Sequence, residues 1–398
     1  MKVGIYIGET TAELGGGYRF IDNILNALVT LNDPQHHFVL FHYGVIGERY
    51  KDCLHIETHR LPGRLSYNGI TGSGILKASS YAFNRFMAYA GLKDPPKTVL
   101  QKAVDTSGAQ IMWYPTMDFE EVDIPYVYNV LDIQHLIQPY FPEVSAKGEW
   151  ERRESMFGTA IRKASFLLTG TQAGKDQLVD LYHVAEQRIR FLKHPVPELL
   201  ADKAIDVRKK WQLDKPFIFY PAQFWSHKNH VMLLEMLRYI KVEKQIVIQA
   251  VFSGSDKGNM DHVRTWAHNL GVIDQVRFTG FVEMNELIAF YKEALCLTYP
   301  SYFGPENFPP LEAAELSCPV IAADVPGARE QIGDFSILLE PSDQKLWGET
   351  VYRLATDKDF AEDRKKKLVI GNPYYFKDYL NDIVSILKEF EPIRRNWP

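Results

Sequence analysis

The sequence predicts an α/β protein made of two doubly wound parallel sheets that face each other across a cleft. Short apolar segments rich in β-branched and aromatic residues recur along the 398-residue chain. Several are continuous rather than alternating, as strands buried on both faces must be. Helix-like segments separate many of them, a pattern typical of parallel sheets covered by helices. The pattern restarts in the middle of the chain, which is long enough for two or three domains of roughly 150 residues.

The first half contains seven segments that we expect to form strands. Between the first two, residues 18–31 (YRFIDNILNALVTL) have helical periodicity. The strand segments are KVGIYIG (2–8), HFVLFHY (37–43), LHIETHR (54–60), AQIMWYP (109–115), IPYVYNVLD (124–132), SFLLTGT (165–171) and IRFLKHP (189–195).

The second half contains six further strand segments, with a helical segment at 230–240 (HVMLLEMLRYI) after the first of them. The strand segments are PFIFYPA (216–222), QIVIQAVFSG (245–254), QVRFTGF (275–281), ALCLTYP (294–300), PVIAAD (319–324) and SILLEP (336–341).

A polar stretch flanked by prolines, ADKAIDVRKKWQLD (201–214), separates the two halves. We therefore predict one domain over residues 1–200, a second over 201–375, and an amphipathic helix within 376–398 that crosses back to the first domain. Ligands bind outside the carboxyl ends of strands in such sheets. We expect the functional residues in the loops that follow strands.

Composition excludes several classes of protein. A net charge of −5 disfavours a nucleic-acid binder. Cys53, Cys296 and Cys318 are far apart and form no CxxC or Cys/His pattern, so neither a disulfide framework nor a zinc site is indicated. The N-terminus is too weakly apolar for a signal peptide, and no run of about 18 apolar residues exists. We expect a cytoplasmic protein.

The first candidate site is the glycine-rich loop ETTAELGGGYRF (9–20), which follows the first strand. Gly15, Gly16 and Gly17 open a helix there, where free N–H groups and close backbone approach suit a phosphate. The loop is neither GxGxxG nor a Walker loop. The alternative is a flexible turn that happens to be rich in glycine.

The second candidate is YPAQFWSHKNH (220–230), after the first strand of the second half. Lys228 suits a diphosphate as a compact charge, and Gln223 adds a neutral donor. The alternative is a solvated surface lysine. His227 and His230 could suggest a metal, but no carboxylate is near them in the sequence, and we prefer ordinary loop or helix-start histidines.

The third candidate is LDIQHLIQP (131–139), at the end of a first-half strand. His135 could donate a hydrogen bond or move a proton near neutral pH. The alternative is a structural role, which is the more common one for a lone histidine.

The fourth candidate is YPSYFGPENFPPLEAAEL (299–316), where Glu306 and Asn307 follow a strand and Glu312 is expected in the first turn of a helix. A carboxylate there can accept the hydroxyls of a ribose through charge-assisted hydrogen bonds of about 1.5–3 kcal/mol each. The alternative for Glu312 is a favourable charge at a helix N-terminus.

Taken together, these residues resemble a family-4 glycosyltransferase of the GT-B fold, a "group 1" glycosyltransferase. The resemblance covers nearly the whole chain and is strongest over residues 276–341, with FYPAQFWSHKNH (219–230) as second support. It implies a donor-binding second domain and an acceptor-side first domain. Members retain anomeric configuration and generally need no metal, so we expect no metal and no cofactor.

Residue by residue, the resemblance implies that Lys228 binds the donor diphosphate and that Glu312, the second glutamate of a paired-Glu motif, holds the donor ribose. Many members have an arginine where Gln223 stands. The first glutamate of the motif falls on Gly304, a departure for which Glu306 could compensate. The implied catalytic residues are His135, Glu306 and Lys228.

The resemblance also implies a wider donor site. Gly15, Gly16 and Gly17 would approach the phosphates or the sugar, and His135 would lie near the transfer point. Backbone groups of Asn307 and Phe308 would contribute to the sugar site. The backbone around Phe281 and Val282 would face the base.

The acceptor side is suggested by residues 60–100, which contain six Lys or Arg, one acidic residue (Asp94) and interleaved aromatics. This segment could contact an anionic membrane surface or a lipid-diphosphate acceptor. The alternative, a helix that packs its aromatics into the first domain, is slightly preferred. A membrane role would place the protein peripherally at the inner membrane face.

We therefore expect a retaining glycosyltransferase that moves a hexose, from GDP-mannose or a UDP-hexose, to a glycan or lipid-linked acceptor. A GT-B sugar-nucleotide epimerase or hydrolase is a rival. Gly304 motivates another rival, a catalytically silent nucleotide-sugar-binding subunit. A glucan phosphorylase is disfavoured because such enzymes are much longer.

Overall fold

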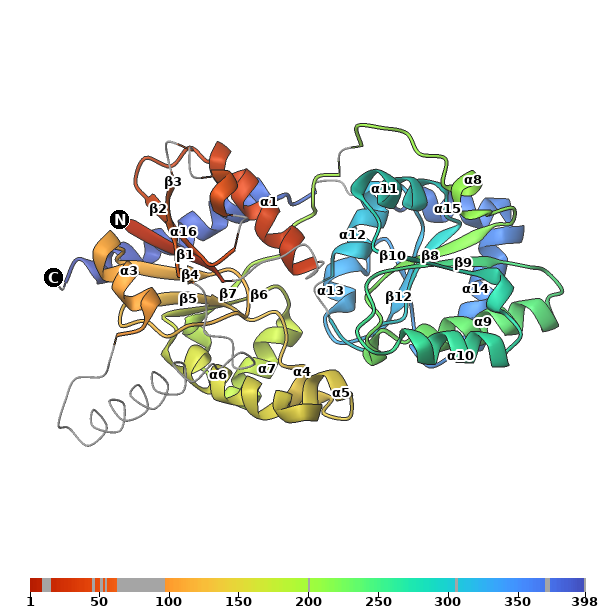
Figure 1. Cartoon of the computed structure of the whole chain (residues 1–398), viewed down its shortest axis with the longest axis horizontal. Coiled ribbons are helices and arrows are strands. Elements are labelled where there is room, and N and C mark those ends of the chain that lie inside the picture. The colour runs from red at the N-terminus through yellow and green to blue at the C-terminus, as the bar shows by residue number, and fades with distance from the viewer. Residues whose placement is uncertain are drawn as a thin grey trace. The chain divides into compact units, whose positions relative to one another are not determined.

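The computed structural model describes residues 1–8, 16–44, 47–50, 53, 56–62, 97–199, 201–304, 307–368 and 373–396. Within these residues the chain forms two sheets, one of seven strands and one of six (Figure 1). Every segment predicted to be a strand contains one. The predicted fold class, two α/β domains that each have a parallel sheet, is confirmed.

The described chain divides into two compact units. The first comprises Met1–Asn129, Met156–Leu167 and Ile386–Pro398, and the second comprises Val130–Ser155 and Leu168–Ser385. The domain ranges inferred from the sequence stay a prediction.

The first sheet has the strand order β3-β2-β1-β4-β5-β6-β7. Its strands β1 to β5 pair in parallel, with Val3 opposite Phe38 on one side and Ile111 on the other. The strands are β1 (Lys2–Gly8), β2 (His37–His42), β3 (Ile56–Arg60), β4 (Ile111–Tyr114), β5 (Tyr126–Asn129), β6 (Phe166–Thr169) and β7 (Ile189–Phe191).

The helices of this part of the chain lie between the strands in sequence, as a parallel sheet requires. They are α1 (Gly16–Thr30), η2 (Gly47–Tyr50), α3 (Val99–Ser107), α4 (Gln134–Ile137), α5 (Pro142–Ser145), η3 (Ala146–Gly148), α6 (Glu149–Lys163), α7 (Gln172–Tyr182) and η4 (Glu186–Arg188).

The second sheet is parallel throughout and has the order β10-β9-β8-β11-β12-β13. This is the doubly wound order in which the first strand is central and the chain later reverses its direction across the sheet. The strands are β8 (Phe217–Pro221), β9 (Gln249–Ser253), β10 (Val276–Gly280), β11 (Cys296–Tyr299), β12 (Val320–Ala323) and β13 (Ile337–Leu339).

Parallel strands need crossover connections, which are usually helices that lie on the faces of the sheet. Figure 1 shows α9 and α10 on one side of the strands and α11 and α12 on the other. The helices are α8 (Val207–Trp211), η5 (Ser226–Lys228), α9 (His230–Glu243), α10 (Met260–Asn269), η6 (Ile273–Gln275), α11 (Met284–Glu293), α12 (Phe308–Glu315), α13 (Ala328–Ile332), α14 (Gln344–Thr356), α15 (Lys358–Lys366) and α16 (Phe376–Arg394).

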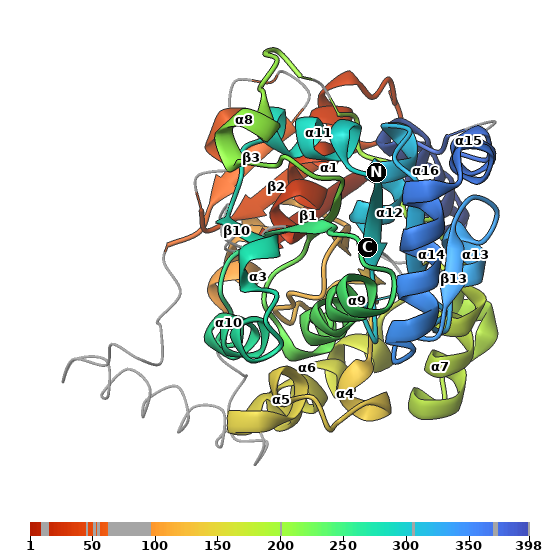
Figure 2. The same cartoon turned by 90° about the vertical axis from the view of Figure 1, so that its right-hand side faces the viewer.

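The core of the second unit explains why its strands read as continuous apolar runs. Phe217 to Tyr220 of β8 are all 0% exposed because helices cover both faces of the strand. Phe219 stacks on Phe290 of α11 with ring centroids 5.1 Å apart. The outer helix α14 lies beside α9 (Figure 2). A Cβ on Gly348 would lie 2.6 Å from a ring carbon of Tyr239, so glycine permits this close approach.

The amphipathic helix expected near the C-terminus is α16. Its last turns belong to the first unit, where Glu391 lies 3.3 Å from Nε2 of the buried His36. Of the helices that the structure describes, none combines the length and the apolar character needed to cross a membrane.

Candidate active site

The candidate site lies where the chain reverses direction in the second sheet, between β8 and β11. These two strands are neighbours, and Cys296 and Leu297 of β11 pair with Ile218 and Phe219 of β8. Open parallel sheets bind ligands outside the carboxyl ends of strands at this point. The loop after β8 contains Lys228, and β11 ends at Tyr299.

The loop after β8 is fixed by backbone geometry and two side chains. Asn229 ends the short η5 helix with φ of 58°, a left-handed conformation that asparagine tolerates better than most residues. Its Nδ2 donates to the carbonyl oxygens of Pro300 (3.2 Å) and Pro341 (2.8 Å). The Tyr220 hydroxyl donates to the Lys228 carbonyl oxygen at 2.7 Å. Lys228 is therefore presented from a constrained backbone.

The Lys228 ammonium contacts two hydroxyl groups. Its Nζ lies 3.0 Å from the Tyr299 hydroxyl and 3.4 Å from Ser301 Oγ, and 5.2 Å from the centre of the Tyr299 ring. Burial lowers the pKa of Lys228 to about 8, while the Asp132 and Glu143 carboxylates act in the opposite direction. Among the described residues Lys228 forms no ion pair within 4.0 Å. Its charge is thus available to an anionic ligand.

Tyr299 connects Lys228 to the loop after β11. The Tyr299 hydroxyl donates to Asn307 Oδ1 at 2.6 Å. Asn307 is the extended residue that precedes α12. Gly304, which the resemblance aligns with the first motif glutamate, has φ of 94°, a conformation that favours glycine. The sequence analysis did not include Tyr299 and Ser301 among the candidate site residues. The signal that could have identified them is a hydroxyl side chain at or just after the end of a buried strand.

Glu312 is 1% exposed, and its Oε2 accepts a hydrogen bond of 2.7 Å from the Tyr291 hydroxyl. The expectation that Glu312 lies in the first turn of its helix is wrong, because α12 already begins at Phe308. Pro309 and Pro310 need no helical amide partner at the start of a helix, so they extend α12 towards the N-terminus. A favourable charge at the helix end therefore does not explain Glu312.

His135 lies in α4 and is 0% exposed. Its Nε2 is 2.8 Å from Glu154 Oε1, and the Tyr182 hydroxyl donates to the same carboxylate oxygen at 2.5 Å. Burial lowers the pKa of His135, with Glu154 opposing this effect. The structure shows a histidine fixed among side chains of α6 and α7. Its predicted place near the transfer point stays a prediction.

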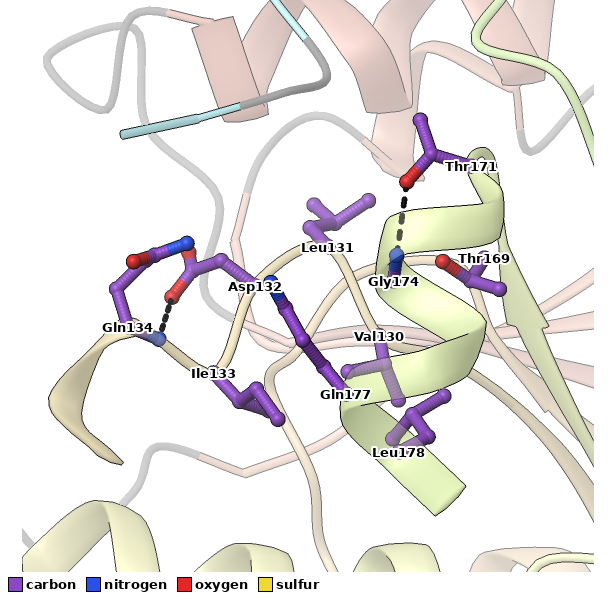
Figure 3. A pocket seen from close by; sticks show the side chains of 10 residues that line it. All are labelled: Val130, Leu131, Asp132, Ile133, Gln134, Thr169, Thr171, Gly174, Gln177 and Leu178. Carbon is purple, nitrogen blue, oxygen red and sulfur yellow. Dashed lines mark hydrogen bonds between the residues drawn. The ribbon is translucent and has the colours of Figure 1, made fainter. Parts of the chain in front are cut away.

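Figure 3 shows a small hollow of mixed polar and apolar lining at the carboxyl ends of β5 and β6. Asp132 faces it and accepts a hydrogen bond from the Gln134 backbone N–H at 3.2 Å. Thr171 caps α7 by accepting from the Gly174 N–H at 3.0 Å. A Cβ on Gly174 would lie 2.2 Å from Thr169 Oγ1, so glycine lets α7 approach the strand end closely. His135 is not among the residues that line this hollow.

The two histidines beside Lys228 pack against aromatic rings. His227 stacks on Phe303 with centroids 3.7 Å apart, and His230 stacks on Phe224 at 4.4 Å. Burial lowers the pKa of His227 to about 4 and that of His230 to about 3. The structure brings Glu143 against His227, a partner 84 residues away that the sequence could not indicate. Among the described residues, no group of three or more His, Cys, Asp or Glu could hold a metal ion.

The remaining donor-site residues are more scattered. Gln223 donates to Ser255 Oγ (3.1 Å) and accepts from Trp225 Nε1 (3.1 Å). Phe281 is 66% exposed after β10, and Val282 beside it is partly buried. The buried Phe308 ring lies 4.6 Å from that of His194. The predicted contacts of these residues with the base and the sugar stay predictions.

Gly16 and Gly17 are exposed at the start of α1, and a Cβ added to either would meet nothing within 4 Å. Packing of the described chain therefore does not require glycine at these two positions. Gly15 and Glu306 lie outside the described residues, as do residues 63–96 of the basic aromatic segment.

Comparison with known proteins bears directly on the second sheet and its loops. Residues 202–368 match the family model described as glycosyl transferases group 1. This region contains Lys228, Asn307 and Glu312, and over these residues the chain is similar to group 1 glycosyltransferases, as the sequence predicted. The finer family-4 assignment stays a prediction.

Two relatives by sequence are mannosyltransferases. The chain is 25% identical over 228 residues to the O-antigen chain mannosyltransferase RfbU of Salmonella typhimurium, covering 56% of this chain and 60% of that protein. It is 23% identical over 240 residues to O-antigen chain mannosyltransferase B of Escherichia coli, covering 56% and 62%. The matched region thus spans about three fifths of the length of these relatives.

Solved structures resemble the whole chain. HepE of Anabaena, in complex with UDP and glucose, has a TM-score of 0.69 at 14% identity over 98% of this chain and 100% of that one. WaaG, a glycosyltransferase involved in lipopolysaccharide biosynthesis, has a TM-score of 0.63 at 16% identity over 92% and 94%. These similarities confirm the predicted GT-B fold.

Proposed function

We propose that this protein is a retaining glycosyltransferase that moves a hexose from a nucleotide-diphosphate sugar to a hydroxyl of a glycan or lipid-linked acceptor. The observation that carries the proposal is the Lys228 ammonium at the switch point of the second sheet. It is held by the Tyr299 and Ser301 hydroxyls at 3.0 and 3.4 Å and forms no ion pair with a described carboxylate. A diphosphate is the natural counter-charge for such a group.

In the proposed reaction, the leaving group departs from one face of the sugar and the acceptor hydroxyl attacks on the same face. The bond between C1 and the diphosphate oxygen breaks, which gives an oxocarbenium-like sugar and a leaving group with added negative charge. Lys228, cationic below a pKa of about 8, stabilises that charge where it develops. The acceptor hydroxyl attacks C1 from the same face and gives its proton to the departing phosphate oxygen. This route needs no pair of carboxylates in the manner of a glycosidase.

We propose mannose as the transferred hexose and GDP-mannose as the first donor to test. The support is that the two relatives described above are named mannosyltransferases. A UDP-hexose is the second choice, since HepE of the same fold holds UDP and glucose. The family-4 assignment, retention and independence of metal ions belong to this proposal.

For the acceptor, we propose a growing surface polysaccharide or its lipid-linked precursor. Both mannosyltransferase relatives are named for O-antigen chains. The basic aromatic segment at residues 60–100 is the proposed contact with anionic lipid, at the inner membrane face.

The experiment that tests the proposal is nucleotide binding followed by transfer. Thermal unfolding is measured with GDP, UDP, dTDP and ADP for the wild type, Lys228→Ala and Lys345→Ala, a control at an exposed lysine of α14. A nucleotide at 100 times its Kd adds about 2.7 kcal/mol to stability. We expect one nucleotide to stabilise the wild type and the control but not Lys228→Ala.

The corresponding nucleotide sugar is then supplied with lipid-linked saccharides as acceptors. Product carrying the added hexose with retained configuration supports the proposal. Binding without transfer to any acceptor favours the silent binding subunit, and nucleotide release that ignores the acceptor favours a hydrolase or epimerase. No stabilisation by any nucleotide contradicts the proposal.

A further inference from the structure

The space beside Gly304 is already occupied by a side chain. A Cβ built on Gly304 would lie 2.9 Å from Asn307 Nδ2 and 3.0 Å from Asn307 Oδ1. Distances this short force one of the two residues to move. The φ of 94° at Gly304 also disfavours any other residue. The Asn307 carboxamide therefore stands where a side chain at position 304 would begin.

Hydrogen-bond directions fix the roles of the two ends of that carboxamide. An ammonium can only donate, so the Tyr299 oxygen accepts from Lys228 Nζ at 3.0 Å. The Tyr299 proton is then free to donate to Asn307 Oδ1 at 2.6 Å. Burial raises the pKa of Tyr299, so the hydroxyl keeps this proton. Asn307 Nδ2 is left as the donor end of the carboxamide, and both ends lie about equally close to a Cβ on Gly304, at 2.9 and 3.0 Å.

The arrangement differs in charge from a paired-glutamate site. A glutamate at position 304 would place a carboxylate one hydroxyl away from Lys228. A neutral carboxamide presents N–H donors instead and adds no negative charge beside the ammonium. A nearby carboxylate favours the charged form of a lysine and raises its pKa.

We infer that Asn307 is a positioning residue that replaces the side chain of residue 304 and holds the Lys228 ammonium through the Tyr299 hydroxyl. The inference rests on the proposed function for its role in donor binding, but the pairing of Gly304 with Asn307 stands on the geometry alone. Gly304→Glu does not restore a paired-glutamate site, because the new side chain displaces Asn307.

The first test is a double-mutant cycle on thermal unfolding of the full chain, which needs no ligand. Gly304→Ala is expected to lower Tm by at least about 2 °C. In the double variant Gly304→Ala with Asn307→Ala, the loss of Tm is expected to be smaller than the sum of the two single losses, because the truncated residue 307 makes room while the backbone strain at 304 remains. Losses that simply add would show that the two side chains do not compete for space and would overturn the pairing.

The second test measures whether substitution of Asn307 changes the contribution of Lys228 to nucleotide binding. The Kd of the nucleotide that stabilises the wild type is measured from pH 6.5 to 9.5, with Asn269→Ala as an exposed control. We expect Asn307→Ala to weaken binding at least fivefold, and Asn307→Asp to move the alkaline loss of binding upward by about half a pH unit or more. Unchanged pH profiles in both variants would overturn the positioning role. If no nucleotide binds the wild type, the proposed function fails while the unfolding cycle still decides the pairing.

Discussion

The Glu143 carboxylate accepts two hydrogen bonds from His227, one from the backbone N–H at 2.8 Å and one from ring Nδ1 at 2.5 Å. The two side chains are only 6% and 9% exposed. His227 directly precedes Lys228, and its ring stacks on Phe303, which directly precedes Gly304. One carboxylate of α5 therefore orders both loops of the candidate site.

Removing this carboxylate should cost stability. In Glu143→Ala two buried N–H donors lose their acceptor, a loss of about 1–3 kcal/mol for each unsatisfied group. Glu143→Gln keeps an acceptor oxygen and should lose clearly less. Urea unfolding compares both with Glu151→Ala, which removes an exposed glutamate of α6. Equal stability of Glu143→Ala and the α6 control would contradict the role given to Glu143.

The charge of Lys228 should make nucleotide binding depend on pH. Because burial lowers its pKa to about 8, the free protein loses this charge as the pH rises through 8. We expect the nucleotide Kd to rise above pH 8 in the wild type and to stay flat in Lys228→Arg, since arginine remains charged. Lys228→Ala should weaken binding at least tenfold at pH 7, about 1.4 kcal/mol. Calorimetric titrations between pH 6.5 and 9.5 measure all three.

The same group affects folding in the opposite sense. The pKa of Lys228 in the folded protein lies below its unfolded value of about 10.4, so the unfolded chain binds more protons between these values. The contribution of Lys228 to the free energy of unfolding therefore rises as the pH increases from 8 to 10.4. Lys228→Met should be more stable than the wild type near pH 7, and the difference should shrink above pH 8. A constant difference would argue against a lowered pKa.

Glu312 should act on the donor, and Tyr291 should act on the fold. Tyr291→Phe deprives the buried Glu312 carboxylate of a hydroxyl donor at 2.7 Å, and we expect a loss of about 1–3 kcal/mol in chemical unfolding. Glu312→Ala should weaken donor binding or transfer at least tenfold. Wild-type kinetics in Glu312→Ala, measured at a temperature where the variant is fully folded, would remove Glu312 from the site.

Alanine substitutions of the glycines at the start of α1 should affect turnover without lowering Tm. Since a Cβ on Gly16 or Gly17 meets nothing within 4 Å, alanine at either position should leave Tm equal or higher. If a ligand approaches this backbone, the same substitutions should lower turnover at least tenfold. Steady-state kinetics of Gly16→Ala and Gly17→Ala decide this, with Gly158→Ala in α6 as a control whose Cβ also meets nothing. Wild-type turnover in both variants would mean that no ligand approaches this backbone and that the loop is an ordinary glycine-rich turn.

The sequence predicted the strands well because burial on both faces leaves a continuous apolar run that needs no knowledge of partners. It also predicted which loops carry the candidate residues, because Lys228 and Asn307 follow strands. It could not predict the contacts between loops. The pairs Glu143–His227 and Tyr299–Lys228 join residues 84 and 71 positions apart, and apolar periodicity carries no information on them. The start of α12 was expected nearer to Glu312, but Pro309 and Pro310 are compatible with the first positions of a helix, and α12 begins at Phe308.

The close approach of Asn307 to Gly304 also constrains how this loop can evolve. A change from glycine to glutamate at position 304 is not a neutral step while asparagine stands at 307, and a change to asparagine at 307 meets the same barrier in a relative that has glutamate at 304. The two positions are expected to change together among related sequences, with a side chain at 304 accompanied by a residue other than asparagine at 307. The paired-glutamate and glycine–asparagine forms of this loop would then be connected through sequences that have glycine at 304 and a residue other than asparagine at 307.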